Sequence, residues 1–290
     1  MERGHITLVG DAHVHLYDEY PLAAALRNLY AHLTAWSQPR PAGAPPVVLV
    51  GFLAESADAR RFPRLLAGAE RLDDARLRLR PGPDAESLEV LEGVRSLGWL
   101  IAGRQVVSSE RLEFLALASA AEMPDGRPAE ETVAEIRRRG GVPVASWAAG
   151  KWLGARGRCL RRLLETLPPS ALLIGDTSLR PRLCPQPALM RQAARRGFRT
   201  LAGSDPLPIA GDEQTLGCYA FSVDAIFDPA QPAASVRAAL LNPNQRFQLL
   251  GRRNGLLTFL RRWLAHSAAR CRGQRPAAGP GGSATAAPHP

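Results

Sequence analysis

The first residues that suggest chemistry are two histidines near the start of the chain. His13 and His15 are two positions apart and follow the apolar segment 5–9, a pattern that predicts a strand. Side chains two apart in a strand point to the same face, so both imidazoles are expected to reach one cation. Asp11 is expected to add an oxygen ligand or an acceptor behind the ligands. We predict a site for zinc, manganese or iron, one or two ions, on Asp11, His13 and His15, the alternative being two histidines that only hydrogen-bond.

Three further carboxylates accompany predicted strands. Glu113 lies within the strand 112–117, Asp176 follows the strand 171–174, and Asp205 follows the strand 198–202. In a parallel β/α barrel the strand ends meet at one opening, so these side chains are expected to converge. We predict Glu113 as a metal ligand, Asp205 as a ligand with a catalytic role, and Asp176 as a catalytic group. For Asp176, the Asp-Thr-Ser stretch also fits a helix cap.

A glycine-rich basic loop follows the predicted strand 142–146. It contains Lys151, the one lysine among 37 lysines and arginines, which indicates either a position that needs a compact charge or one lysine left over from drift in composition. Glycines allow backbone N–H groups to approach an anion. We predict an anion or phosphate site on Gly150, Lys151, Gly154 and Arg156, with Lys151 also taking part in catalysis. The alternative is a plain connection with solvated basic side chains.

Alternating strands and helices must position these groups. Besides 5–9, 112–117, 142–146, 171–174 and 198–202, strands are predicted over 47–53, 76–80, 99–101 and 105–107, and helices over 21–36, 54–72, 128–139, 158–167 and 187–196. Repeated strand–helix units favour a parallel sheet, and their number favours an α/β fold built as a distorted, TIM-like (β/α) barrel of about seven strands. The remaining segments add a strand at 214–227 and C-terminal helices at 233–241 and 245–266.

Four of these segments together resemble a known family. The segments 10–15 (Gly-Asp-Ala-His-Val-His), 112–113 (Leu-Glu), 140–145 (Gly-Gly-Val-Pro-Val-Ala) and 203–205 (Gly-Ser-Asp) occur in this order. The series resembles the PHP (polymerase and histidinol phosphatase) family of metal-dependent hydrolases over about residues 5–210. The resemblance implies a distorted seven-stranded barrel, two or three metal ions and phosphoester hydrolysis. By it, His13 and His15 match the first motif, Glu113 the bridging carboxylate and Asp205 the late aspartate.

Two departures from that family pattern limit what the site can hold. Ser146-Trp147 stands where the family has a His-Pro pair, and Leu207 stands where a histidine follows the late aspartate. A full three-metal site is therefore not expected. We predict a divergent metal-dependent phosphoesterase that acts on a small anionic or phosphorylated substrate. The alternative is a catalytically reduced binding or regulatory protein that keeps an anion pocket.

The C-terminal part of the chain has a different composition. We predict one domain over 1–266, including the C-terminal helices, and a disordered segment over 267–290, which is rich in proline, glycine, alanine and serine. The helix 245–266 carries a stripe of Phe247, Leu250, Leu257, Leu260 and Leu264 beside arginines. It is expected either to pack on its own domain or to bind a membrane surface or partner.

The net charge of +10 is concentrated in that part of the chain. From residue 251 onward there are seven arginines and no acidic residue, and without them the net charge falls to +3. A nucleic-acid partner is therefore not expected. No apolar run is long enough to span a membrane, no signal-peptide core precedes the first strand, and the four cysteines are far apart, so a cytoplasmic location is expected.

Overall fold

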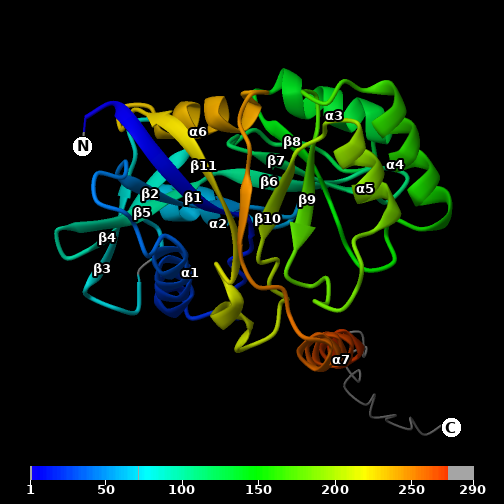
Figure 1. Cartoon of the computed structure of the whole chain (residues 1–290). Helices are drawn as coiled ribbons and strands as arrows, with labels where there is room; N and C mark the ends of the chain where they lie inside the picture. The colour runs from blue at the N-terminus through cyan, green and yellow to red at the C-terminus, as the bar shows by residue number, and fades with distance from the viewer. Residues whose placement is uncertain (1, 71, 274–290) are drawn as a thin grey trace, which may run out of the picture.

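The computed structural model describes residues 2–70 and 72–273, in which strands and helices alternate (Figure 1). The strands are β1 (Gly4–Val14), β2 (Val47–Leu53), β3 (Leu77–Pro81), β4 (Ser87–Glu92), β5 (Arg95–Ile101), β6 (Gly103–Val107), β7 (Glu113–Leu117), β8 (Val142–Ser146), β9 (Leu173–Thr177), β10 (Thr200–Gly203), β11 (Tyr219–Phe227) and β12 (Gln248–Gly251). The helices are α1 (Leu22–Trp36), α2 (Arg61–Leu66), α3 (Ala129–Arg138), α4 (Gly154–Thr166), α5 (Ala188–Arg195), the short 3₁₀ turn η1 (Asp212–Thr215), α6 (Pro232–Leu241) and α7 (Leu256–Gly273).

The strands form two sheets, and the described residues do not close a single hydrogen-bonded barrel. The larger sheet has the order β12-β11-β1-β2-β5-β4-β3, and the smaller has the order β10-β9-β8-β7-β6. Strands β1, β2 and β5 are parallel, as are β8, β9 and β10. The expectation of an α/β fold is confirmed, whereas the distorted barrel of about seven strands is not, since the strands lie in two sheets that share a core.

That shared core explains why the central strands are nearly all apolar. Val50, Phe52 and Phe221 of the larger sheet pack in one cluster with Leu115 and Val144 of the smaller sheet. Strands buried on both faces are expected to be continuous apolar runs, as β2 and β8 are. Helix α1 packs on the larger sheet, while α3, α4 and α5 cover the smaller one (Figure 1).

One strand of the smaller sheet runs against its neighbours. β7 is antiparallel to both β6 and β8, and Phe114 pairs with Ala145. The first residue of β7, Glu113, therefore lies at the edge where β8 ends with Ser146. We call this edge, where β8, β9 and β10 end, the carboxyl edge.

Several predicted elements differ in extent from those observed. The helix predicted over 54–72 is only α2, and β4 was not predicted. The helix predicted over 245–266 divides into β12 and α7, because Gly251 adopts a φ of 80° and β12 pairs with β11. Helix α7 continues to Gly273, so 267–273 is helical where disorder was predicted, and 274–290 lies outside the described residues.

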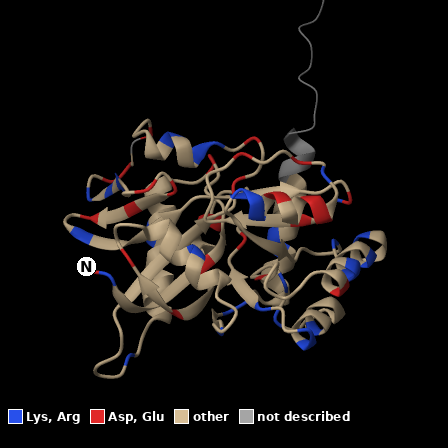
Figure 2. Cartoon of the chain, turned by 90° about the horizontal axis from the view of Figure 1, so that it is seen from above, with Lys and Arg blue, Asp and Glu red and all other residues tan. Residues whose placement is uncertain are grey.

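Helix α7 leaves most of its apolar side chains in contact with solvent. Leu257 is 83% exposed and Leu264 is 60% exposed, while Arg262 is buried in an ion pair with Asp212 of η1. Of the predicted apolar stripe, Phe247 and Leu250 pack against the domain, whereas Leu257, Leu260 and Leu264 of α7 are exposed. Basic residues are frequent on the outer helices (Figure 2). Arg158 and Arg162 of α4 are exposed. Within the described residues, no helix is both long and apolar enough to cross a bilayer.

Candidate metal centre

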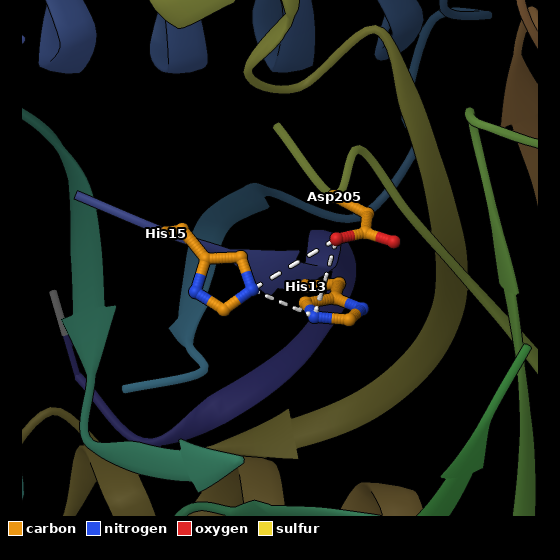
Figure 3. A group of neighbouring side chains, drawn as sticks. All are labelled: His13, His15 and Asp205. Atoms are coloured by element: carbon orange, nitrogen blue, oxygen red, sulfur yellow. Dashed lines mark hydrogen bonds and ion pairs between the residues drawn. The ribbon is translucent and has the colours of Figure 1, made fainter. Parts of the chain in front are cut away.

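Two histidines and one aspartate from distant parts of the chain meet at the carboxyl edge (Figure 3). His13 Nε2 and His15 Nε2 are 3.0 Å apart, and Asp205 Oδ1 lies 3.6 Å from the first and 3.8 Å from the second. A circle through three atoms at these separations has a radius of about 2.0 Å, which equals a typical zinc–ligand distance. We call this group the His-His-Asp cluster. Its donor atoms and spacing fit one divalent ion.

The backbones of β1 and β10 bring the cluster together. The N–H of Asp205 donates to the carbonyl of His13 at 2.9 Å, and Asp205 itself has a φ of 50°. A Cβ on Gly203 would lie 2.6 Å from the backbone nitrogen of His13, closer than real Cβ contacts. Glycine at the end of β10 thus permits the close approach, and the left-handed backbone at Asp205 then turns its carboxylate towards the imidazoles.

Ser146 and Gln105 lie against the two nitrogens of the His13 ring, but only Ser146 can hydrogen-bond the ring while Nε2 binds a cation. The Ser146 hydroxyl lies 3.2 Å from His13 Nδ1, and Gln105 Oε1 lies 3.2 Å from His13 Nε2. For Nε2 to bind a cation, Nδ1 must carry the proton and donate it to Ser146. Sequence reasoning missed Gln105, although its place in a predicted strand was the available signal. Ser146, noted as a missing histidine, instead supports a ligand.

Burial sets the protonation preferences of the cluster. Burial lowers the pKa of His15 well below its usual value, and the neighbouring His13 lowers it further. Burial also raises the pKa of Asp205, which the charge of His13 opposes and the charge of Glu113 reinforces. A buried, uncharged imidazole is ready to donate its lone pair. A cation would compensate the carboxylate that burial disfavours.

Asp11 lies outside this cluster although it belongs to the same strand. Its carboxylate accepts hydrogen bonds from the N–H groups of His13, Ser204 and Gly217 and from the Ser204 hydroxyl. The pairing of β1 with β2 shifts register between Asp11 and Val14, which breaks the simple alternation of faces. Asp11 therefore joins β1 to the loop after β10 and to the turn that precedes β11.

Glu113 and Lys151 face each other beside the cluster. Lys151 Nζ donates to Glu113 Oε1 in an ion pair, in which Lys151 is 35% exposed and Glu113 is 13% exposed. The predicted ligand Glu113 thus has an ammonium group as its partner. Its charge nevertheless acts on Asp205 and on Tyr17, whose ring stacks on His15 at 5.1 Å.

The remaining residues of the predicted anion loop surround a separate cavity. Gly150 and Gly154 line a cavity of about 440 Å³ together with Trp147, Trp152 and Arg158. Arg156 instead donates to the carbonyl of Gly150 at 3.1 Å. The loop is anchored by Trp152 Nε1, which donates to the carbonyl of Ser146 at 3.1 Å. Residue 146 therefore contacts both Trp152, which lines the cavity, and His13 of the cluster.

Asp176 belongs to a different buried network. Arg180 donates to both of its oxygens, at 2.7 and 2.5 Å, and the Tyr219 hydroxyl lies 3.0 Å from Oδ2. Both charged residues are almost fully buried. Through these partners the Asp176 carboxylate links β9 to the following loop and to β11.

Comparison with known proteins adds similarity of fold. No family model and no curated protein sequence matches the chain. Among solved structures, PsfC from Pseudomonas syringae PB-5123 is similar with a TM-score of 0.53 and 14% identity, over 94% of this chain and all of that one. This likeness shows the fold alone.

Other solved structures share less of the fold. A two-domain protein from Bacteroides vulgatus ATCC 8482, described as containing a predicted PHP-like metal-dependent phosphoesterase, has a TM-score of 0.42 and 13% identity over 90% of this chain and 70% of its own. Endonuclease Q from Pyrococcus furiosus has a TM-score of 0.43 and 12% identity over 83% of this chain and 57% of its own. An endonuclease Q complex with a 27-mer duplex substrate has a TM-score of 0.45 and 12% identity over 83% of this chain and 58% of its own. The expectation that nucleic acid is no partner stays a prediction.

Proposed function

We propose that the protein is a metal-dependent hydrolase of phosphoesters and a divergent PHP-like protein. The observation that carries the proposal is the His-His-Asp cluster, whose three donor atoms fit a single divalent ion. A divalent ion held there would polarise a phosphoryl oxygen and lower the pKa of a water molecule. The sequence motifs that resemble PHP proteins support the same reaction class.

The residues of the chain would have different roles around that ion. His13, His15 and Asp205 would hold it, while Ser146 would orient the ring of His13 through Nδ1. The second carboxylate oxygen of Asp205 remains available to accept a proton from the attacking water. Gly150, Gly154 and Arg156 belong to the loop that would bind the substrate anion. Asp176 and Asp11 stabilise the strands that carry the site, so we assign them no chemical step.

The architecture fits the same proposal. The two sheets approach each other along β1 and β10, and a bridge between Glu55 and Arg104 links the end of β2 to β6. We propose that they represent a distorted barrel that is open between these pairs of strands. Residues 1–266 would then act as one catalytic unit, with the His-His-Asp cluster at its carboxyl edge.

A metal-binding and hydrolysis assay tests the proposal. Chelator-treated protein is given Mn²⁺, Zn²⁺ or Fe²⁺, and its metal content and hydrolysis of 4-nitrophenyl phosphate are measured. His13→Ala should lose the ion and the activity together, because it removes one of three donors. His5→Ala is the matched control, since His5 is an exposed residue at the other end of β1. Metal-free wild-type protein, or activity that survives in His13→Ala, would contradict the proposal.

The second candidate is a binding or regulatory protein without turnover. It is favoured by the ion pair between Lys151 and Glu113, which engages a carboxylate that the resemblance assigns to a metal. In that case the wild-type protein would bind the ion and an anion such as inorganic phosphate but hydrolyse no phosphoester. Turnover that disappears in His13→Ala would exclude this candidate.

A further inference from the structure

The ion pair between Lys151 and Glu113 is built by two adjacent strands. β7 starts at Glu113 and runs against β8, so Glu113 lies beside the end of β8. The chain after β8 turns back through a hydrogen bond from the N–H of Lys151 to the carbonyl of Ala148. Trp152, which is 6% exposed, fixes this turn to the end of β8. Lys151 therefore reaches Glu113 from an anchored position.

The negative charges of Glu113 and Asp205 favour a cation beside Glu113. Glu113, a part-buried carboxylate, lies close enough to Asp205 for its negative charge to act on that residue. A divalent ion on the His-His-Asp cluster compensates Asp205, but Glu113 needs a second positive charge. Lys151 provides it, and a protonated amine is a compact point charge that fits where a planar guanidinium would demand a wider, bidentate partner. The chain contains no other lysine.

We propose that the Lys151 ammonium occupies the position of a second cation beside Glu113, so that the centre takes a single divalent ion on His13, His15 and Asp205. In this arrangement Glu113 forms an ion pair with Lys151 and does not ligate the ion. The inference rests on the metal site of the proposed function and adds the number of ions. It also gives the chain's only lysine a positioning role, in which it neutralises the charge of Glu113.

A double-mutant cycle on metal affinity tests this inference. Stoichiometry and Kd for Mn²⁺ are measured by isothermal titration on full-length wild type, Lys151→Met, Glu113→Gln and the double variant. The wild type should bind one ion per chain. Lys151→Met should bind Mn²⁺ about tenfold more tightly or take a second ion, because a carboxylate is left uncompensated. Glu113→Gln should bind about tenfold more weakly, because the ammonium then repels the ion.

The double variant is the decisive member of the cycle. With both charges removed, its affinity should return to within about threefold of the wild type, since distant compensated charges act little on the ion. Arg162→Met is the control for loss of a positive charge, because Arg162 is exposed on α4. Thermal unfolding confirms that each variant is folded.

Two results would overturn the inference. Two ions per wild-type chain would show that Lys151 does not replace one. A double variant as weak as Glu113→Gln would show that Glu113 is itself a ligand. If the cycle behaves as expected but no phosphoester is hydrolysed, the inference stands and the proposed function fails. If the wild type binds no ion, both fail.

Discussion

The hydroxyl of Ser146 lies 3.2 Å from Nδ1 of His13, so the end of β8 supports a ligand carried by β1. A hydrogen bond to the far nitrogen of a ligating imidazole fixes its tautomer and its orientation. Ser146 stands where the family pattern has a histidine. At the position of that histidine, this chain therefore has a hydroxyl group that contacts the candidate ligand His13.

Ser146→Ala should weaken metal binding without unfolding the protein. The variant removes the acceptor for the Nδ1 proton of His13, and loss of such a partner typically costs 10- to 100-fold in metal affinity. The Kd for Mn²⁺, measured by isothermal titration, checks this. Ser146→Thr, which keeps the hydroxyl, serves as the control, and an unchanged affinity in Ser146→Ala would show that the contact does not orient the ligand.

Gly203→Ala should separate the two strands that carry the cluster. The added methyl group would press on the backbone of His13, so β10 must move away from β1. We expect a loss of about 1–3 kcal/mol in the free energy of unfolding, as for other overpacked positions, together with loss of metal binding. Urea unfolding and metal titration measure both effects. Gly255→Ala, with open space around residue 255, should leave both unchanged.

Acid should destabilise the metal-free protein partly through His15. The pKa of His15 is lowered by burial, so between its folded pKa and about 6.5 the unfolded chain binds more protons than the folded chain. Stability from this group is therefore full above about pH 6.5 and is lost as the pH falls below it, by about 1 kcal/mol at pH 5.5.

Urea unfolding of chelator-treated wild type and His15→Gln at pH 7.5 and 5.5 isolates that contribution. Asp11 and Asp205 have raised pKa values and act in the opposite direction at lower pH, so the difference between the two proteins is the quantity to compare. An equal loss of stability in both proteins would rule out His15 as the source.

Asp176→Asn should reduce stability and leave metal affinity intact. The change removes the buried negative charge that faces Arg180, and breaking a buried pair in this way costs about 3 kcal/mol or more. Urea unfolding and Mn²⁺ titration measure the two quantities. A variant of normal stability that has lost only its phosphoesterase activity would instead support the catalytic role predicted from the sequence.

The sequence predicted best those elements whose signal is local. The strands 47–53 and 142–146 were predicted with the observed bounds, because each is a short, mostly apolar run that begins directly after proline or glycine. The helix predicted over 245–266 failed because its first part pairs with β11, an interaction made with a distant segment. Apolar residues alone do not distinguish an edge strand from the start of a helix.

In the candidate site, too, the sequence predicted local patterns better than contacts between distant segments. The spacing of His13 and His15 was enough to place them on one face, and the structure brings Asp205 to them. Asp11 was expected on the same face, but the register shift after it directs its carboxylate to Ser204 and Gly217. The partnership of Glu113 with Lys151 depends on the reversed direction of β7, which periodicity does not reveal.

The buried ion pair between Arg262 and Asp212 has a practical consequence for anyone who shortens the chain. Asp212 also accepts a hydrogen bond from the N–H of Leu207, two residues after the ligand Asp205. A truncated protein that ends before Leu256 would leave this carboxylate buried without its guanidinium partner. The segment that presents Asp205 would then lose part of its support. Helix α7 thus stabilises the segment that carries Asp205. Deletions of this helix made to improve expression would also alter the His-His-Asp cluster.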